Sequence, residues 1–164
     1  MRVVCLGVIH GDFNHQNVLI RRSDSPLSES TGSDVVSVVG AIDFGDSEYA
    51  PYVYELSIAI MYCMLHSRSP LDVGGHLLAG YLSRRPRALS ALERSAVWPC
   101  VAARFAQSLT LGVYTHSLDP ANDYVLKTSR RGWSLLKELW EDTSAEQFNA
   151  KIDTVLASYG LFTS

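Results

Sequence analysis

The chain has 164 residues, of which 47% are hydrophobic, so it is long enough for one ordinary globular core and too short for two comfortable domains. Its 14 Lys and Arg stand against 17 Asp and Glu, giving a formal net charge of -3, and no basic stripe indicates a nucleic-acid partner. The most apolar later run, residues 58–65, is too short to cross a bilayer, so no membrane span is expected.

The first part of the chain is predicted to be β-structure around a polar turn. Residues 3–9 and 18–21 form short apolar runs typical of strands, and the β-branched residues 35–42 predict a third strand. Residues 21–34 are rich in Ser and have almost no large apolar side chain, which predicts a flexible, solvated loop. We therefore expect a small β-ribbon layer.

The next part of the chain has a helical pattern. Residues 52–66 are apolar on nearly every face, which predicts a central buried helix. A second helix is expected to follow Ser69, and a third is expected to follow Ser90. Pro99 should kink or split that third helix, because proline removes a backbone donor.

Two further helices are predicted, over about 120–140 and 144–159. A capping box starting at either Thr143 or Ser144 can begin the last of them, since a Glu or a Gln stands three residues later. The pattern as a whole predicts an α+β fold over residues 1–164, in which the β-ribbon layer is followed by a mainly helical bundle.

The cysteines give no sign of a disulfide framework or a metal site. They are odd in number, widely spaced and set among apolar neighbours: Cys5, Cys63 and Cys100. No pair has the spacing of metal ligands, and reduced core thiols are typical of a cytosolic protein. A cytoplasmic location is therefore expected.

Two polar turns carry the candidate chemistry. The stretch "HGDFNHQN" places His10, Asp12 and Asn17 in one turn, and a later strand ends in "AIDFGD" with Asp43 at its edge. Phosphoryl transfer needs a carboxylate that orients and deprotonates the attacking hydroxyl, and an amide plus a second carboxylate that hold Mg²⁺. Asp12, Asn17 and Asp43 match these roles, with His10 as a brace. Taken alone, the first turn is equally well a simple hairpin turn.

The same residues carry a resemblance to a known family. "HGDFNHQNVLI" with "GAIDFGDSEYAPYVYELSIAI" resembles the C-terminal lobe of the aminoglycoside phosphotransferase and choline kinase-like superfamily, whose members are small-molecule kinases related to the protein kinases. Within it, "IDFGDSEYAPYVYELSIAIMYCM", "SPLDVGGHLLAGY" and "ARFAQSL" resemble the hydroxylysine kinase family. The resemblance implies a protein-kinase-like C-terminal lobe.

The resemblance also implies roles for single residues. It implies Asp12 as the catalytic base supported by His10, Asn17 and Asp43 as the residues that bind Mg²⁺ and the nucleotide, and Glu55 as a support of the catalytic turn. The implied reaction moves the terminal phosphoryl group of GTP or ATP to the hydroxyl of 5-hydroxy-L-lysine, a step in lysine degradation.

One part of the superfamily pattern has no counterpart in this sequence. The superfamily carries a glycine-containing phosphate loop and a nucleotide-contacting Lys in an N-terminal lobe. No Gly-rich motif replaces that loop, and no lysine stands in a predicted strand: Lys127, Lys137, Lys151. We interpret the chain as a partial or truncated form without the nucleotide lobe. A non-catalytic binding module, or a kinase for choline or homoserine, remains an alternative, and the oligomeric state is open.

Three charged residues are candidates for substrate contacts. Asp46 and Glu48 follow the second polar turn and either bind the ammonium groups of the substrate or lie in a solvated loop. Arg104 stands in an apolar helix, where a charge is costly without a partner. It forms either a buried ion pair or a clamp on the substrate carboxylate. The apolar stripe from Trp133 to Trp140 is expected to be core.

Overall fold

The computed structural model describes residues 4–22, 36–85, 88–126 and 128–161. Its elements in chain order are β1 (Leu6–Ile9), β2 (Val18–Arg22), β3 (Val36–Ala41), the 3-10 turn η1 (Phe44–Asp46), β4 (Glu48–Pro51), α2 (Tyr52–His66), α3 (Pro70–Arg84), α4 (Ala91–Leu118), the 3-10 turn η2 (Asp123–Leu126), α5 (Ser129–Trp140) and α6 (Ala145–Ser158). The predicted α+β class, with strands first and helices after, is confirmed.

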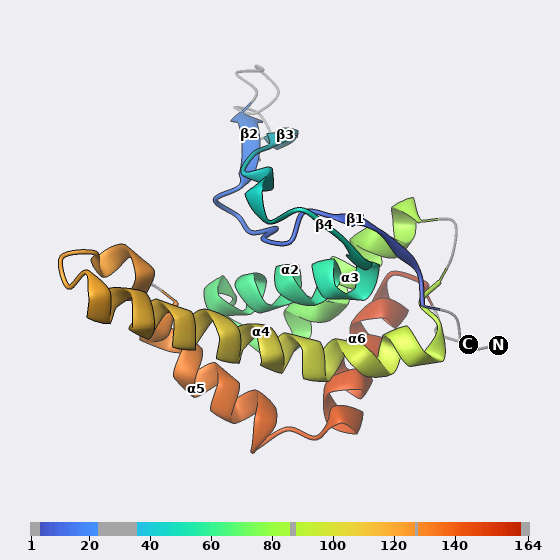
Figure 1. Ribbon diagram of the computed structural model, residues 1–164. Coiled ribbons are helices and arrows are strands. Elements are labelled where there is room, and N and C mark those ends of the chain that lie inside the picture. The colour runs from blue at the N-terminus through green and yellow to red at the C-terminus, as the bar shows by residue number, and fades with distance from the viewer. Residues whose placement is uncertain (1–3, 23–35, 86–87, 127, 162–164) are drawn as a thin grey trace, which may run out of the picture.

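The described strands form two antiparallel ribbons. β1 pairs with β4, and β2 pairs with β3 with a register shift between Leu19 and Ile20. Figure 1 shows the β2/β3 ribbon standing away from the helices, while β1 and β4 run along the helical body. The strands on either side of the first polar turn therefore do not pair with each other. Each pairs with a later strand, and this pairing brings the two polar turns together.

The predicted strands are present, with three main differences. β1 begins at Leu6, so residues 4 and 5 of the predicted strand lie outside it. Arg21, predicted as both strand and loop, and Arg22, predicted as loop, continue β2, and the rest of the predicted loop lies outside the described residues. β4 was not predicted, because its four residues, Glu48–Pro51, are too few to show an alternating pattern and end in Pro.

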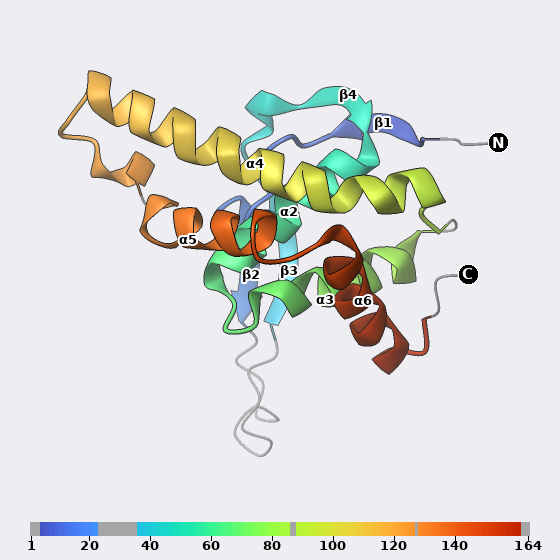
Figure 2. The same cartoon turned by 90° about the horizontal axis from the view of Figure 1, so that it is seen from below.

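The helices supply nearly all of the core. α2 lies at the centre and packs against α3 and α4, while α6 packs against α3 and α5 against α4 (Figures 1 and 2). Ile60, Met61 and Met64 of α2 are fully buried, which confirms the predicted central helix. At about 25 cal/mol per Å² of buried apolar surface, this packing is the main stabilising contribution to the fold.

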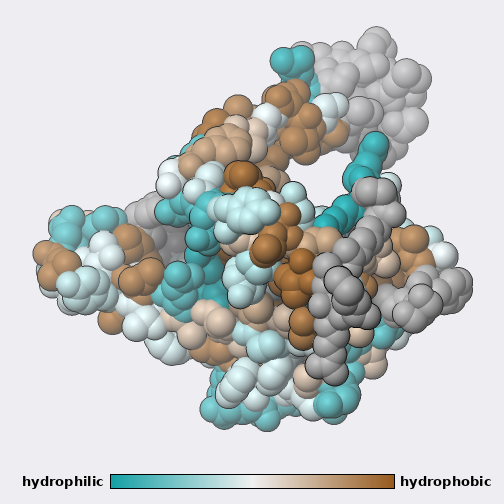
Figure 3. Space-filling model, turned by 45° about the vertical axis from the view of Figure 1, so that its right-hand side comes forward, coloured by the Kyte–Doolittle hydropathy of each residue, from teal (hydrophilic) through white to brown (hydrophobic). Residues whose placement is uncertain are grey.

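The ribbons leave much of their apolar surface exposed. Figure 3 shows apolar side chains on the part of the molecule that projects from the helices. Exposed large apolar residues of the two ribbons include Val8, Ile20, Val38 and Tyr49. Within the described strands, only Ile9 and Ala50 are buried apolar residues of the β1/β4 ribbon. The ribbons are therefore held to the helical body mainly at their junction with α2.

A buried glutamate ties the start of α4 to β1. Ser90 caps α4 in a capping box, in which its hydroxyl accepts from the Glu93 N–H and Glu93 Oε2 accepts from the Ser90 N–H at 2.8 Å. The other carboxylate oxygen of Glu93 accepts from the Cys5 N–H at 2.8 Å. Glu93 is only 1% exposed, so one carboxylate orders both a helix terminus and the approach to β1.

Three details of the helical predictions are corrected. α4 runs through Pro99 without splitting, because buried Val97 and Val101 hold the helix on both sides of the proline. The helix expected over 120–140 is a short 3-10 turn followed by α5. Of the stripe expected to be core, Leu139 is buried, whereas Trp133 and Trp140 are half exposed, since the buried face of α5 is formed by Gly132, Leu135 and Leu139.

The predicted cap of the last helix is resolved in favour of one alternative. Ser144 accepts from the Gln147 N–H and Gln147 Oε1 accepts from the Ser144 N–H, so the box starts at Ser144 and not at Thr143.

None of the cysteines, all of which lie in the described ranges, forms a disulfide. Burial raises the pKa of the Cys63 and Cys100 thiols. None of the described helices has the length and apolarity needed to span a bilayer.

Candidate active site

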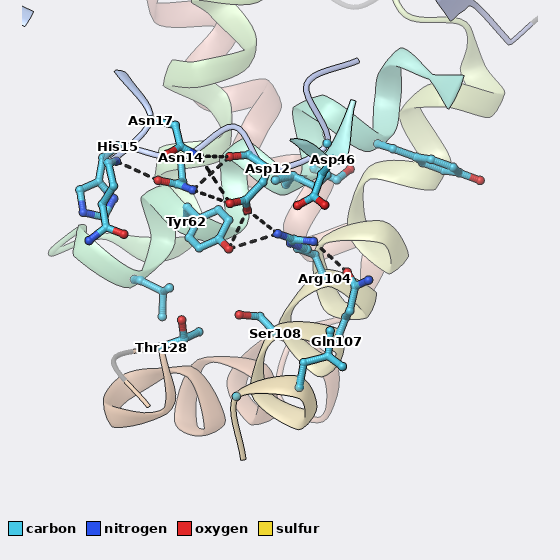
Figure 4. Close-up of a pocket in the computed structure, with 18 of the residues that line it drawn as sticks. Asp12, Asn14, His15, Asn17, Asp46, Tyr62, Arg104, Gln107, Ser108 and Thr128 are labelled. Atoms are coloured by element: carbon cyan, nitrogen blue, oxygen red, sulfur yellow. Dashed lines mark hydrogen bonds and ion pairs between the residues drawn. The ribbon is translucent and has the colours of Figure 1, made fainter. Parts of the chain in front are cut away.

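An open cleft of about 1450 Å³ lies where the two polar turns face the helices. Its walls come from the turn after β1, from η1 and β4, and from α2, α4 and the start of α5 (Figure 4). Six of the predicted site residues line it: Asp12, Asn17, Asp43, Asp46, Glu48 and Arg104. The structure therefore gathers in one cleft residues that lie up to 92 positions apart in the chain.

His10 joins the two polar turns from behind the cleft. Its Nε2 lies 2.8 Å from the carbonyl oxygen of Ile42, and its Nδ1 accepts from the Asp12 N–H at 3.3 Å. The second bond requires Nδ1 to be unprotonated. Nε2 therefore carries the hydrogen and donates a hydrogen bond to the carbonyl oxygen of Ile42. Both ring nitrogens are engaged, and the ring is 9% exposed. His10 therefore braces the turns and has no nitrogen left for proton transfer.

The carboxylate of Asp12 is held by side chains from three elements. Oδ1 accepts from the Tyr62 hydroxyl at 2.9 Å and from Arg104 Nη2 at 2.5 Å. Oδ2 accepts from the amides of Asn14 at 3.0 Å and Asn17 at 3.4 Å. Figure 4 shows this network at the centre of the cleft. The side chain of Asp12 is 23% exposed, so it is fixed in position and partly exposed to the cleft.

Tyr62 and Arg104 support each other as well as Asp12. Burial raises the pKa of the Tyr62 hydroxyl, partly offset by the Arg104 charge, so the hydroxyl stays protonated and can donate to Asp12. Arg104 Nη2 also lies 3.1 Å from the Tyr62 oxygen, and its Nη1 donates to Gln107 at 2.9 Å. Arg104 Nε is buried with no partner among the described residues. The predicted ion pair of Arg104 is thus present, and its partner is Asp12.

Asn17 is buried beneath Asp12 and ties the turn together. It is 7% exposed, its amide nitrogen donates to the Asp12 carbonyl at 3.0 Å, and its own carbonyl accepts from the Ile42 N–H at 3.0 Å. Because the amide nitrogen faces Asp12, the amide oxygen is directed elsewhere. We find no hydrogen bond to that oxygen from any described residue, which leaves it available as a ligand.

Asp43 has an unusual backbone conformation. Its φ of 66° and ψ of 62° are left-handed, and within the described ranges no other non-glycine residue has a positive φ. Such a conformation costs free energy and persists where the surroundings impose it, often at functional sites. It turns the chain from β3 into η1, and the Asp43 side chain lines the cleft.

Asp46 and Glu48 lie on the same wall of the cleft as Asp43. Both side chains are exposed, and both line the cleft. In Figure 4 the Asp46 carboxylate faces the space next to Arg104. This wall therefore adds negative charge opposite the helices.

Gly11 permits the close contact between the two turns. Its φ is +83°, and a Cβ at this position would lie 2.2 Å from the carbonyl oxygen of Asp46. Both the backbone conformation and the lack of space exclude a side chain.

Gly11→Ala is therefore expected to destabilise the fold by about 2–4 kcal/mol or to displace the Asp12 turn. Urea unfolding of the 164-residue chain measures the loss. Gly80→Ala is the matched control, because a Cβ at Gly80 meets nothing within 4 Å, and it should leave stability unchanged or raise it. Equal stability of the Gly11 and Gly80 variants would show that the two turns do not touch as described.

Glu55 lies in the first turn of α2, behind the cleft. Its Oε2 accepts from the Gly11 N–H at 3.0 Å, and its Oε1 is buried without a partner among the described residues. The side chain of Glu55 thus reaches the first polar turn from α2. It does not line the cleft.

The sequence did not reveal several cleft residues. Tyr62 stands in an apolar helix, where its sequence context does not predict a polar contact. Asn14 lies in the first polar turn, but only its neighbours His10, Asp12 and Asn17 were identified as candidates. His15 and His66 also line the cleft, with ring centroids 4.2 Å apart. Burial and the neighbouring His66 lower the pKa of His15. These contacts depend on the approach of α2 to the turn, which no local pattern shows.

Comparison with known proteins identifies the family. The model of the phosphotransferase enzyme family matches residues 5–92, more than half of the chain. The chain belongs to this family. The matched residues include Asp12, Asn17, Asp43 and Tyr62, whereas Arg104 lies beyond them.

Curated relatives of this phosphotransferase chain are hydroxylysine kinases. It is 43% identical to the mouse (Mus musculus) enzyme and 42% identical to the bovine (Bos taurus) enzyme, each over 133 residues that cover 80% of this chain and 34% of the relative. The zebrafish (Danio rerio) enzyme is 40% identical over 133 residues, covering 80% of this chain and 35% of the relative. The chain therefore spans about a third of the length of these relatives. No solved structure matches it.

Proposed function

We propose that this chain carries the catalytic turns of a kinase that transfers the terminal phosphoryl group of GTP or ATP to the hydroxyl of 5-hydroxy-L-lysine. The observation that carries the proposal is the meeting of the two polar turns, which sets Asp12, Asn17 and Asp43 around one cleft. The identity of about 40% to hydroxylysine kinases supports the choice of acceptor.

In the proposed mechanism Asp12 acts as the base. The acceptor hydroxyl donates a hydrogen bond to the Asp12 carboxylate, which orients its oxygen for in-line attack and takes the proton as the new phosphate ester bond forms and the bond to the leaving nucleotide breaks. Because the transition state of phosphoryl transfer is loose, positioning supplies most of the catalysis. Tyr62 and Asn14 provide that positioning through their bonds to Asp12.

Asn17 and Asp43 would hold Mg²⁺. One amide oxygen and one carboxylate are hard ligands, and they suit an ion that keeps several waters and binds the phosphates of the nucleotide. No group of three or more His, Cys, Asp or Glu side chains in the described ranges is placed to hold a metal, so in this proposal the phosphates of the nucleotide and water would supply the remaining ligands. When bound, the ion neutralises charge on the phosphates. The orphan amide oxygen of Asn17 supports this assignment.

Asp46 and Glu48 would bind the ammonium groups of the acceptor. 5-Hydroxy-L-lysine carries two amines, and the exposed carboxylates on this wall match them in charge. Choline carries a single cationic group and homoserine a single amine, so they would leave part of this wall unused.

In this proposal the described residues form the C-terminal lobe of the kinase, and the nucleotide lobe is not among the described elements. The helical content and the short ribbons support this reading, as do Lys137 and Lys151, which lie on α5 and α6 and not on a strand. The nucleotide contacts of a second lobe would then complete the cleft.

The test is an acceptor comparison in a chimera, in which this chain replaces the aligned third of mouse hydroxylysine kinase. With Mg²⁺ and GTP or ATP, the chimera should phosphorylate 5-hydroxy-L-lysine at least about tenfold faster than choline or homoserine, and should not phosphorylate L-lysine. The mouse enzyme is the positive control for the assay. A folded chimera that prefers choline or homoserine, or that transfers to none of these acceptors, contradicts the proposed function. In the latter case a non-catalytic binding role is favoured.

A further inference from the structure

The proposed base has no vacant hydrogen-bonding position. A carboxylate offers about four acceptor positions, and Asp12 fills them with Tyr62, Arg104, Asn14 and Asn17. An acceptor hydroxyl can therefore bond to Asp12 only if one of these donors withdraws. Asn14 and Asn17 belong to the same turn as Asp12 and face Oδ2, so the exchange concerns Oδ1 on the cleft side.

Of the two donors to Oδ1, Arg104 is the one that can leave Asp12 for a better partner. Figure 4 shows Arg104 and Tyr62 between Asp12 and the open space bounded by Ser108 and Thr128. Arg104 Nε lacks a partner among the described residues, and Nη1 is bound only to the neutral oxygen of Gln107. A guanidinium normally pairs with a carboxylate through two parallel bonds. Arg104 reaches Asp12 through Nη2 alone, so this pair is not the best one that Arg104 can form.

We propose that Arg104 recognises the carboxylate of the acceptor and, by turning to it, releases Asp12 Oδ1 for the acceptor hydroxyl. The inference rests on the proposed function and narrows its substrate class to hydroxylated amino acids with a free carboxylate. In 5-hydroxy-L-lysine the hydroxyl and the carboxylate are separated by four carbon–carbon bonds. One molecule can therefore reach Asp12 with the first group and the adjacent guanidinium with the second.

Arg104 differs from the other arginines near the cleft in its partners, because it pairs with the carboxylate of Asp12. Arg131 also lines the cleft, but it donates to the carbonyls of Leu65 and Ser67 at the end of α2. Arg84, at the end of α3, is exposed and does not line the cleft, so it provides a control with the same charge.

The first experiment measures binding to the 164-residue chain by calorimetry, without any phosphoryl transfer. The ligands are 5-hydroxy-L-lysine and 1,5-diaminopentan-2-ol, which keeps both amines and the hydroxyl but lacks the carboxylate. The wild type should bind the amino acid at least about tenfold more tightly. Arg104→Gln should bring the two affinities to within threefold, Arg104→Lys should retain part of the difference, and Arg84→Gln should retain all of it.

The second experiment separates release of the base from simple binding. In the chimera, Arg104→Gln should lower kcat/KM for 5-hydroxy-L-lysine about 10–100-fold, but should leave it unchanged or raise it for 1,5-diaminopentan-2-ol, because Asp12 is then already released. A purely structural role would lower both rates together, as expected for Tyr62→Phe. Thermal unfolding of each variant confirms that it is folded.

The proposal is overturned if Arg104→Gln keeps the wild-type preference, or if the wild type shows no preference or binds neither ligand. Failure of the proposed function is a different result. In that case the carboxylate preference depends on Arg104 in the binding experiment, but the chimera transfers no phosphate.

Discussion

Asp12→Asn in the chimera is expected to lower kcat for 5-hydroxy-L-lysine by roughly 10²–10⁴-fold. The oxygen of asparagine can still accept hydrogen bonds from Tyr62 and Arg104, whereas its nitrogen replaces the oxygen that accepts from Asn14 and Asn17. The amide cannot take up the proton of the acceptor hydroxyl. The initial rate of transfer with Mg²⁺ and a saturating nucleotide measures the effect.

The matched control for this change is Asp142→Asn. Asp142 has a side chain that is 59% exposed and does not line the cleft, so its loss should leave kcat within twofold of the wild type. Thermal unfolding should show that the Asp12 variant remains folded. A kcat within threefold of the wild type in the folded Asp12 variant would exclude Asp12 as the base.

Glu93→Gln is expected to lower the free energy of unfolding by about 2–3 kcal/mol at neutral pH. The carboxylate accepts from the N–H groups of Cys5 and Ser90 at a buried position, and the amide of Gln presents a donor to one of them. A buried donor without a partner costs about 1–3 kcal/mol, and more when a charged acceptor is lost. Urea unfolding measures the change, and Glu138→Gln on the exposed face of α5 should stay within 0.5 kcal/mol of the wild type, roughly the range for surface changes.

The effect of Glu93→Gln should depend on pH in one direction. Burial by itself raises the pKa of Glu93, but the hydrogen bonds from Cys5 and Ser90 outweigh it, and the net pKa is lowered. A lowered pKa in the folded state stabilises the fold above the unfolded pKa, and this contribution is lost as the pH falls through the folded value. The difference between wild type and variant should therefore shrink between about pH 5 and about pH 3. A difference that stays constant would contradict a charged Glu93.

The sequence predicted most elements because their signals are local. The strands β1, β2 and β3 have apolar or β-branched runs, α2 is apolar throughout, and the caps at Ser90 and Ser144 follow the capping-box spacing. What the sequence did not predict depends on partners distant in the chain. β4 forms because β1 offers it an edge, and α4 passes through Pro99 because the surrounding core holds it.

The candidate site shows the same division. The spacing within each polar turn marked Asp12, Asn17 and Asp43, and the cleft brings all three together. The sequence did not predict the hydrogen bonds that Tyr62 and Arg104 donate to Asp12, because these residues lie 50 and 92 positions further along the chain. Arg104 was identified as a charge that needs a partner, but only the packing of α4 against α2 shows which partner it has.

The most direct test of the account is identification of the product by ³¹P NMR. The chimera, incubated with Mg²⁺, GTP or ATP and 5-hydroxy-L-lysine, is predicted to form a phosphomonoester on the C5 oxygen, and the Asp12→Asn chimera is predicted to form at least about 10²-fold less of it in the same time. A phosphoramidate on either amine, or the same amount of the ester from both proteins, would contradict the assignment of Asp12 and of the hydroxyl as the groups between which the proton moves.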